Sequence, residues 1–148
     1  DNAIIIPIDT LFPFDMLCLA IQAFSENNTG IMWVVTSNPG VNAQNTNRIV
    51  VNDEYVLRDE EGKTRDVCFY ETESLMTSTG VIIASKMYFL EKYRDFNEGN
   101  RNRSSTDLYR DFIPWLLQGG EKISFFDVRV PTPDLGTPER LKQFGRKN

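Results

Sequence analysis

Histidine is absent from all 148 residues of the sequence. Histidine is the general base of Ser-His-Asp and Cys-His catalysis and the most frequent protein ligand of zinc. Its absence excludes both kinds of catalysis and histidine-ligated zinc. Any chemistry must therefore use carboxylates, amines, hydroxyls or a hard metal ion.

Cysteine is scarce as well, since the sequence contains only Cys18 and Cys68. Their spacing matches no metal-binding motif, and both stand in apolar surroundings. Free cysteine is among the most buried residue types, and reduced cysteine is typical of the cytoplasm. We therefore expect both to be reduced core residues of a cytoplasmic protein.

Long apolar runs and excess positive charge are also lacking. No run approaches the roughly 20 residues of a membrane-spanning helix, and no basic N-terminal stretch leads into a signal core. Lysine and arginine total 16 against 21 aspartate and glutamate residues, a formal charge of -5. This acidic balance disfavours general nucleic-acid binding and polybasic membrane contact. We expect a soluble protein that binds neither.

The composition that is present is that of a folded domain. Hydrophobic residues make up 41% of the chain and aromatic residues 11%, which is typical of a globular protein. The length favours a single domain over residues 1–148. Because the chain opens abruptly on an apolar strand, we expect residues that precede Asp1 in a longer parent, and an exposed first strand would favour pairing with them or with a second copy.

The strongest single pattern is the apolar run at residues 3–12, which carries one carboxylate, Asp9. A short run rich in β-branched residues predicts a strand buried on both faces, as in a parallel sheet. Apolar residues at helical spacing follow Pro13, with Asp15 as the candidate cap. Ligands of open α/β sheets gather at the carboxyl ends of strands, so Asp9 is a candidate to meet a ligand or metal. The alternative is that Asp9 only caps the turn.

The rest of the chain alternates strands and helices around a hairpin. Helices are predicted at 86–96, at 108–117 with Asp107 as cap, and after Thr137; strands are predicted at 31–35, 49–51, 55–57, 67–70, 79–84 and 123–128. Strand-helix units around a hairpin insertion predict an α/β, Rossmann-like layered sheet, mostly parallel with an antiparallel portion.

Several motifs in this order carry a family resemblance. They are the strand ending in Asp9, Thr79-Gly80 opening an apolar strand, Ile113-Pro114 followed by Gly119-Gly120, and Asp134-Leu135-Gly136-Thr137-Pro138. In these features the chain resembles the sugar-1-phosphate nucleotidyltransferases, which make NDP-sugars. The resemblance covers essentially the whole chain, but only the second part of the family's catalytic domain. The family's amino-terminal glycine-rich nucleotide loop has no counterpart.

The resemblance implies transfer of a nucleotidyl group from an NTP to a sugar 1-phosphate, giving an NDP-sugar and pyrophosphate. It implies Mg²⁺ held by Asp9 and Asp134, which are also the implied catalytic residues. It further implies that Glu71 holds sugar hydroxyls and that Thr79 and Gly80 line the sugar pocket. For Gly80, a purely packing role is the alternative.

The chain departs from the family pattern at three places. Ile8 replaces a glycine before the first acid, Thr132 and Pro133 replace a tryptophan and an aromatic residue, and Thr72 stands where the phosphate-binding lysine is expected. These departures leave two other readings open, a catalytically weak regulatory or binding member of the fold, and a structural or assembly module without a metal site. The readings differ in whether Asp9 and Asp134 lie together.

Overall fold

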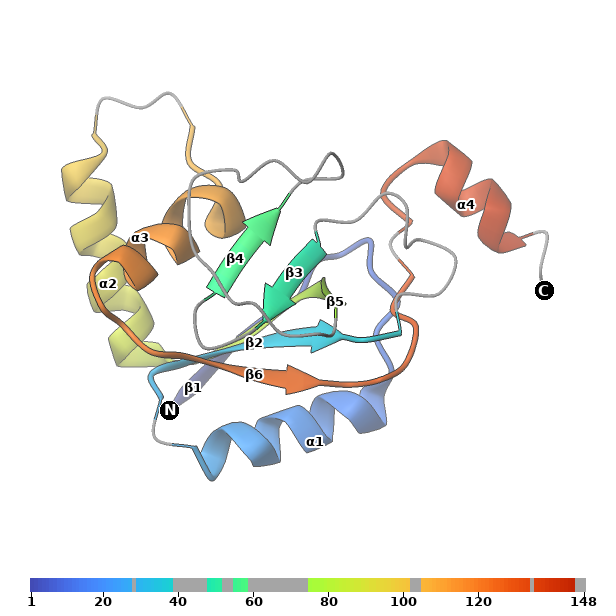
Figure 1. The fold of residues 1–148 in the computed structure, drawn as a ribbon, viewed down its shortest axis with the longest axis horizontal. Coiled ribbons are helices and arrows are strands. Elements are labelled where there is room, and N and C mark those ends of the chain that lie inside the picture. Colours follow the sequence, from blue (N-terminus) through green and yellow to red (C-terminus); the bar gives the residue numbers. More distant parts are fainter. Residues whose placement is uncertain are drawn as a thin grey trace.

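Six strands form one sheet in the computed structural model, which describes residues 1–27, 29–38, 48–51, 55–58, 75–101, 105–133 and 135–145. The strand order is β4-β3-β5-β2-β6, and β1 also pairs with β5 (Figure 1). The strands are β1 (Asn2–Ile5), β2 (Ile31–Thr36), β3 (Arg48–Val51), β4 (Tyr55–Arg58), β5 (Leu75–Ser85) and β6 (Ile123–Asp127). The helices are α1 (Phe14–Ser25), α2 (Lys86–Gly99), α3 (Ile113–Gln118) and α4 (Pro138–Gly145).

The prediction of a mostly parallel sheet is wrong. Among the described strands, β2 and β6 form a parallel pair, whereas β5 pairs antiparallel with β1, β2 and β3, and β3 pairs antiparallel with β4. The prediction rested on the apolar run at residues 3–12 and on the alternation of strands and helices. Such a run does not give strand direction, because burial on both faces produces it whichever way the neighbouring strands point. β1, β2 and β6 do run in one direction, but β5 separates β1 from β2.

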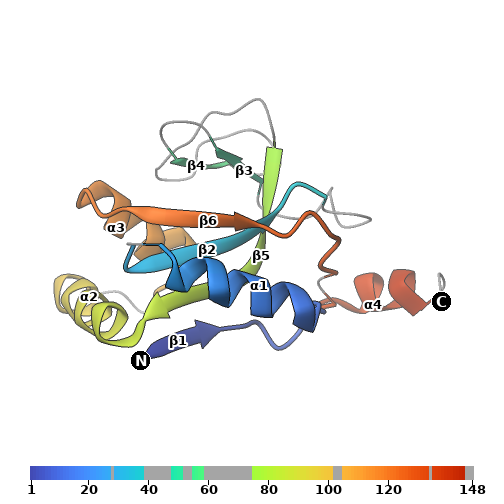
Figure 2. The same cartoon turned by 90° about the horizontal axis from the view of Figure 1, so that it is seen from below.

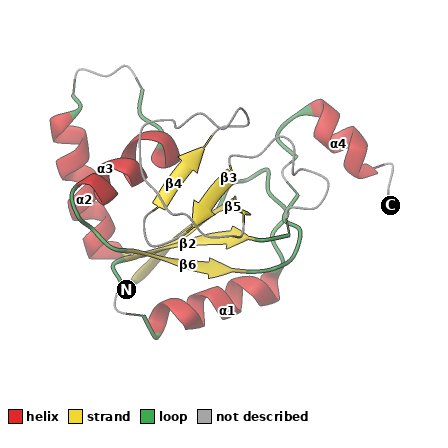
Figure 3. Cartoon of the chain, in the orientation of Figure 1, coloured by secondary structure: helices red, strands yellow, loops and turns green. Residues whose placement is uncertain are grey.

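Helices cover both faces of the sheet, which Figure 3 shows in red on either side of the yellow strands. All six residues of β2 are buried, and its alternate side chains enter two separate cores. Trp33 and its neighbours on that face pack against α2, α3 and the π-helical segment Leu108–Phe112, while Met32 and Val34 pack against Ala20 and Phe24 of α1. The sheet is thus the middle of three layers.

The first strand differs from its prediction in length and burial. Its ladder to β5 covers only Asn2–Ile5, and its residues alternate between exposed and half-buried, with Ile4 41% exposed. No strand among the described residues pairs with its outer edge. Pro7, which lacks a backbone N–H, lies two residues after the ladder ends at Ile5. The continuous burial expected for residues 3–12 is therefore not found.

The helices follow the predicted pattern with local differences. Pro13, not Asp15, is the N-cap of α1, and the Asp107 carboxylate caps the segment at residue 108 by accepting the Tyr109 N–H at 2.8 Å. Cys18, expected in the core, is exposed. It lies two residues from buried Ala20, and residues two apart on a helix point to different sides. Cys68 and the strand predicted at 67–70 lie outside the described residues.

The lengths of the helices also bear on the membrane question. Within the described ranges, none is both long and apolar enough to cross a bilayer.

Candidate functional site

The carboxyl ends of β1, β2 and β6 lie at one edge of the sheet, because these strands run in the same direction. Figure 2 shows this edge on the side where α1 begins and α4 lies. Three segments meet there: the turn from β1 into α1, the residues after β2, and the chain that leads from β6 to α4. In open α/β sheets this is the edge where ligands bind.

Asp9 lies in the turn between β1 and α1, and its side chain is exposed. Its backbone carbonyl accepts a hydrogen bond from the Leu135 N–H at 2.7 Å. Two residues further on, the Leu11 N–H donates to the Pro133 carbonyl at 2.9 Å. The turn that carries Asp9 is therefore tied to the chain on both sides of position 134. Asp134 itself lies outside the described residues, as does Glu71.

The Asp9 carboxylate suits a hard divalent cation. Across the described part of the chain it has no hydrogen-bond or ion-pair partner, so both oxygens are available. Mg²⁺ prefers oxygen ligands and usually takes one or two protein carboxylates, completing its shell with water and phosphate oxygens. The described residues contain no cluster of three or more acidic, cysteine or histidine side chains. A site of the Mg²⁺-phosphate kind does not require one.

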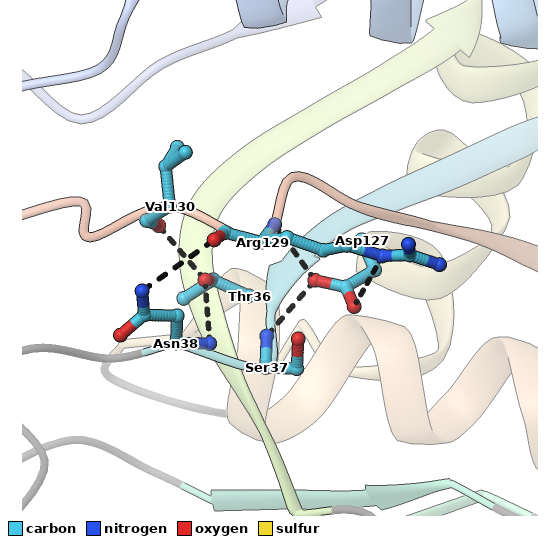
Figure 4. A network of polar contacts seen from close by, with 6 residues as sticks. All are labelled: Thr36, Ser37, Asn38, Asp127, Arg129 and Val130. Carbon is cyan, nitrogen blue, oxygen red and sulfur yellow. Dashed lines mark hydrogen bonds and ion pairs between the residues drawn. The ribbon is translucent and has the colours of Figure 1, made fainter.

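A second carboxylate, Asp127, ends β6 at the same edge and is fully engaged (Figure 4). Its Oδ1 accepts the Ser37 N–H at 2.9 Å and the Arg129 N–H at 3.0 Å. Its Oδ2 lies 3.7 Å from the Arg129 Nε. Asp127 was not predicted as a site residue, because it lies inside the strand predicted at 123–128.

The turn after Asp127 is held by further side chains at the end of β2 (Figure 4). The buried Thr36 hydroxyl donates to the Val130 carbonyl at 2.8 Å and accepts the Asn38 N–H at 3.0 Å. Asn38 Nδ2 also reaches the Arg129 carbonyl at 3.5 Å. Arg129 has a φ of 55°, which costs an L-residue about 1 kcal/mol or more. The network compensates for this strained backbone.

Thr79 and Gly80 lie in β5, where the register with β2 shifts between Val34 and Val35. The Thr79 hydroxyl is buried, donates to the Val34 carbonyl at 2.7 Å and accepts the Val81 N–H at 3.2 Å. With these two hydrogen bonds, the Thr79 hydroxyl bridges the register shift between β5 and β2. A role of Thr79 in sugar binding stays a prediction.

Gly80 has a specific packing reason to be glycine. Its φ is 77°, and a Cβ there would lie 2.4 Å from Pro7 Cγ. Pro7 belongs to the segment that leads to Asp9, so Gly80 lets that segment lie directly against β5. This contact supports the packing alternative, and a role at a sugar pocket again stays a prediction.

Aromatic side chains of the core donate hydrogen bonds to polar groups next to this register shift. The Tyr109 hydroxyl donates to the Gly80 carbonyl, and Trp33 Nε1 donates to Ser78 Oγ at 2.8 Å. Burial, with a smaller contribution from the charge of Asp107, raises the pKa of Tyr109 to about 12. The hydroxyl therefore remains a donor throughout the neutral range.

Another polar cluster lies at the opposite edge of the sheet, where β6 begins. Glu121 pairs with Lys92 and accepts the Tyr88 hydroxyl at 2.9 Å. The hydrogen bond from Lys92, followed by that from Tyr88, lowers the pKa of Glu121. Both carboxylate oxygens are used to join α2 to β6, so this cluster has a structural explanation.

Comparison with known proteins adds the fold relationship. No protein-family model and no curated protein matches the sequence. Among solved structures, the inositol-1-phosphate CTP transferase from T. maritima superimposes with a TM-score of 0.68 over 99% of this chain, at 17% identity. The chain has a nucleotidyltransferase-like fold. The nucleoside-diphosphate-sugar pyrophosphorylase from Vibrio cholerae RC9 gives a TM-score of 0.53 over 98% of this chain, at 18% identity.

These matches cover only part of each solved structure. The chain covers 54% of the T. maritima protein and 56% of the V. cholerae protein. It therefore spans about half the length of the solved structures that it resembles.

Proposed function

We propose that this chain is the sugar- and metal-binding portion of a Mg²⁺-dependent nucleotidyltransferase that makes an NDP-sugar and pyrophosphate from an NTP and a sugar 1-phosphate. One observation carries the proposal. The Asp9 turn is hydrogen-bonded to Pro133 and Leu135, the two neighbours of Asp134, at the ligand-binding edge of a nucleotidyltransferase-like fold.

The proposed reaction needs little covalent chemistry from the protein. An oxygen of the sugar 1-phosphate attacks the α-phosphorus of the NTP, and the bond from that phosphorus to pyrophosphate breaks. Both substrates are polyanions, so the protein acts by positioning them and by offsetting their charge. Asp9 and Asp134 would hold a Mg²⁺ ion. When bound, this ion would offset the negative charge of the phosphate oxygens.

The other site residues take supporting roles in the proposal. Glu71 would accept hydrogen bonds from sugar hydroxyls. Thr79 and Gly80 would shape the sugar side of the site through the irregular part of β5. NTP binding is assigned to a polypeptide portion outside these 148 residues, because the chain contains no glycine-rich loop that would cradle a triphosphate.

The reading of Asp9 as a simple cap is disfavoured by its contacts. An N-cap carboxylate accepts a backbone N–H of the helix that follows. The N-cap of α1 is Pro13, and the Asp9 side chain accepts no such bond within the described segments. This supports a binding role for Asp9 over a purely structural module.

Calorimetric titration of the chain with glucose 1-phosphate, with and without Mg²⁺, tests the proposal. We expect Mg²⁺ to strengthen binding, and Asp9→Asn or Asp134→Asn to remove about 10-fold or more of that gain, because each removes a metal ligand. Asp15→Asn, which neutralises an exposed acid of α1 close by, is the matched control and should keep the gain. An unchanged gain in Asp9→Asn would refute the metal role.

A further inference from the structure

The turn after β6 places a strained arginine at the candidate site. Arg129 is the one non-glycine residue with positive φ within the described ranges, and the other positive values belong to Gly80 and Gly120. Glycine adopts this conformation without a steric penalty, whereas a side chain does not. Unusual backbone conformations of this kind concentrate where structure is constrained for function.

The backbone of Arg129 is fixed on both of its polar sides. Its N–H donates to Asp127 Oδ1 and its carbonyl accepts from Asn38 Nδ2. The next carbonyl, of Val130, accepts from the buried Thr36 hydroxyl (Figure 4). Side chains from β2 and β6 thus hold the turn in one conformation, and the direction in which Arg129 leaves the backbone is set.

The Arg129 guanidinium makes little contact with the described residues. Its side chain is 83% exposed, and its one ion pair with a described residue is a single approach of Nε to Asp127 Oδ2 at 3.7 Å. A bidentate arginine-carboxylate pair has two N–O distances of about 2.7–2.9 Å. Asp127 accepts two backbone N–H groups through its other oxygen, so it orients Arg129 without occupying the fork of the guanidinium.

We propose that Arg129 is a phosphate-binding residue of this site, which holds the phosphate of the sugar 1-phosphate. Four residues after Arg129, the Pro133 carbonyl is bonded to the Leu11 N–H of the turn that carries Asp9. One edge therefore carries a planar cation on one turn and an available carboxylate on the next. Arginine matches phosphate geometry with two parallel N–H donors. The identity of the phosphate as that of a sugar 1-phosphate rests on the proposed function.

Calorimetric titration without Mg²⁺ or NTP tests this assignment, with inorganic phosphate, glucose 1-phosphate and glucose as probes. We expect Arg129→Gly to relax the backbone, to melt at the same or a higher temperature than the native chain, and to bind both phosphates about 10-fold more weakly. Arg129→Lys, a point charge without the fork, should bind less weakly than Arg129→Gly. Arg94→Ala, which removes an exposed arginine of α2, should bind as the native chain does.

The outcomes separate this inference from the proposed function. If Arg129→Gly binds both phosphates as the native chain does, or if the native chain binds neither, Arg129 is not a phosphate ligand. If the phosphates bind through Arg129 but Mg²⁺ gives no gain that depends on Asp9, the assignment of Arg129 stands while the nucleotidyltransferase proposal fails.

Discussion

Asp9 and Asp127 occupy equivalent places with different surroundings. Each follows or ends an apolar strand, and the two strands point to the same edge of the sheet. The Asp127 carboxylate, 19% exposed, accepts two backbone N–H groups and faces Arg129. The Asp9 carboxylate is exposed and has no partner among the described residues. Asp127 therefore stabilises its own turn, whereas the Asp9 carboxylate is available to a ligand.

The largest expected effect is a loss of activity on substitution of Asp9 or Asp134. Under the proposed function, Asp9→Asn and Asp134→Asn should each lower the rate of Mg²⁺-dependent pyrophosphate release by about 100-fold or more, because charge neutralisation of phosphates is lost. For Asp9→Asn, the free energy of unfolding should change by less than about 0.5 kcal/mol, since the Asp9 side chain makes no hydrogen bond or ion pair with the described residues. Native turnover in either variant would discard the metal role.

Gly80→Ala should disturb the Asp9 turn and leave the Asp127 turn in place. The added methyl would meet Pro7 at 2.4 Å on a backbone with φ of 77°. We expect a loss of about 2–3 kcal/mol in the free energy of unfolding, measured by urea titration. Amide chemical shifts should move at residues 8–11 and stay at residues 127–130. Equal shifts at both turns would contradict the separation of the two.

Asp127→Ala should show the reverse signature of Asp9→Ala. It leaves the Ser37 and Arg129 N–H groups without their charged acceptor, at a cost of about 2 kcal/mol in the free energy of unfolding. Asp9→Ala should cost less than about 0.5 kcal/mol in the same urea titration. Similar losses in the two variants would remove the distinction between a structural and an available acid.

Tyr109→Phe should have a modest effect at neutral pH and change how stability depends on pH in alkali. It removes the donor to the Gly80 carbonyl, at a cost of about 1 kcal/mol at pH 7. In the native chain the unfolded tyrosine ionises near pH 10 while the folded pKa is about 12, so the unfolded state binds fewer protons between these values and stability falls as pH rises. Urea titrations from pH 9 to 11 should show this fall in the native chain and a weaker one in Tyr109→Phe. Parallel curves would contradict it.

The sequence predicted those parts of the fold that depend on burial and local spacing. β2, β6, α2 and the hairpin of β3 and β4 were located because apolar periodicity and turn residues mark them. Strand direction was not predictable, since a strand buried on both faces has the same pattern in either direction. The exposure of β1 and Cys18 depends on what packs against them, which the local sequence does not contain.

The sequence pointed to Asp9 of the candidate site but not to Asp127 or Arg129. Asp9 stood out because a lone carboxylate interrupts an apolar run. Asp127 was overlooked because it sits inside a predicted strand with no turn residue beside it. The positive φ of Arg129 has little local signal, because the only local bond to it is from its N–H to Asp127 among the described residues. The other bonds that hold this turn come from Thr36, Ser37 and Asn38, about 90 residues earlier in the chain. Only the pairing of β2 with β6 brings these residues together.

Paramagnetic broadening by Mn²⁺, a substitute for Mg²⁺, tests most directly whether the two ends of the chain share one cation. In the presence of glucose 1-phosphate, we expect loss of the amide signals of residues 9–11 and 134–137 at the same Mn²⁺ concentration, while those of Lys92 and Glu121 at the opposite edge stay sharp. Asp9→Asn should restore the signals of both segments together. Broadening of one segment without the other, or first at Glu121, would contradict it.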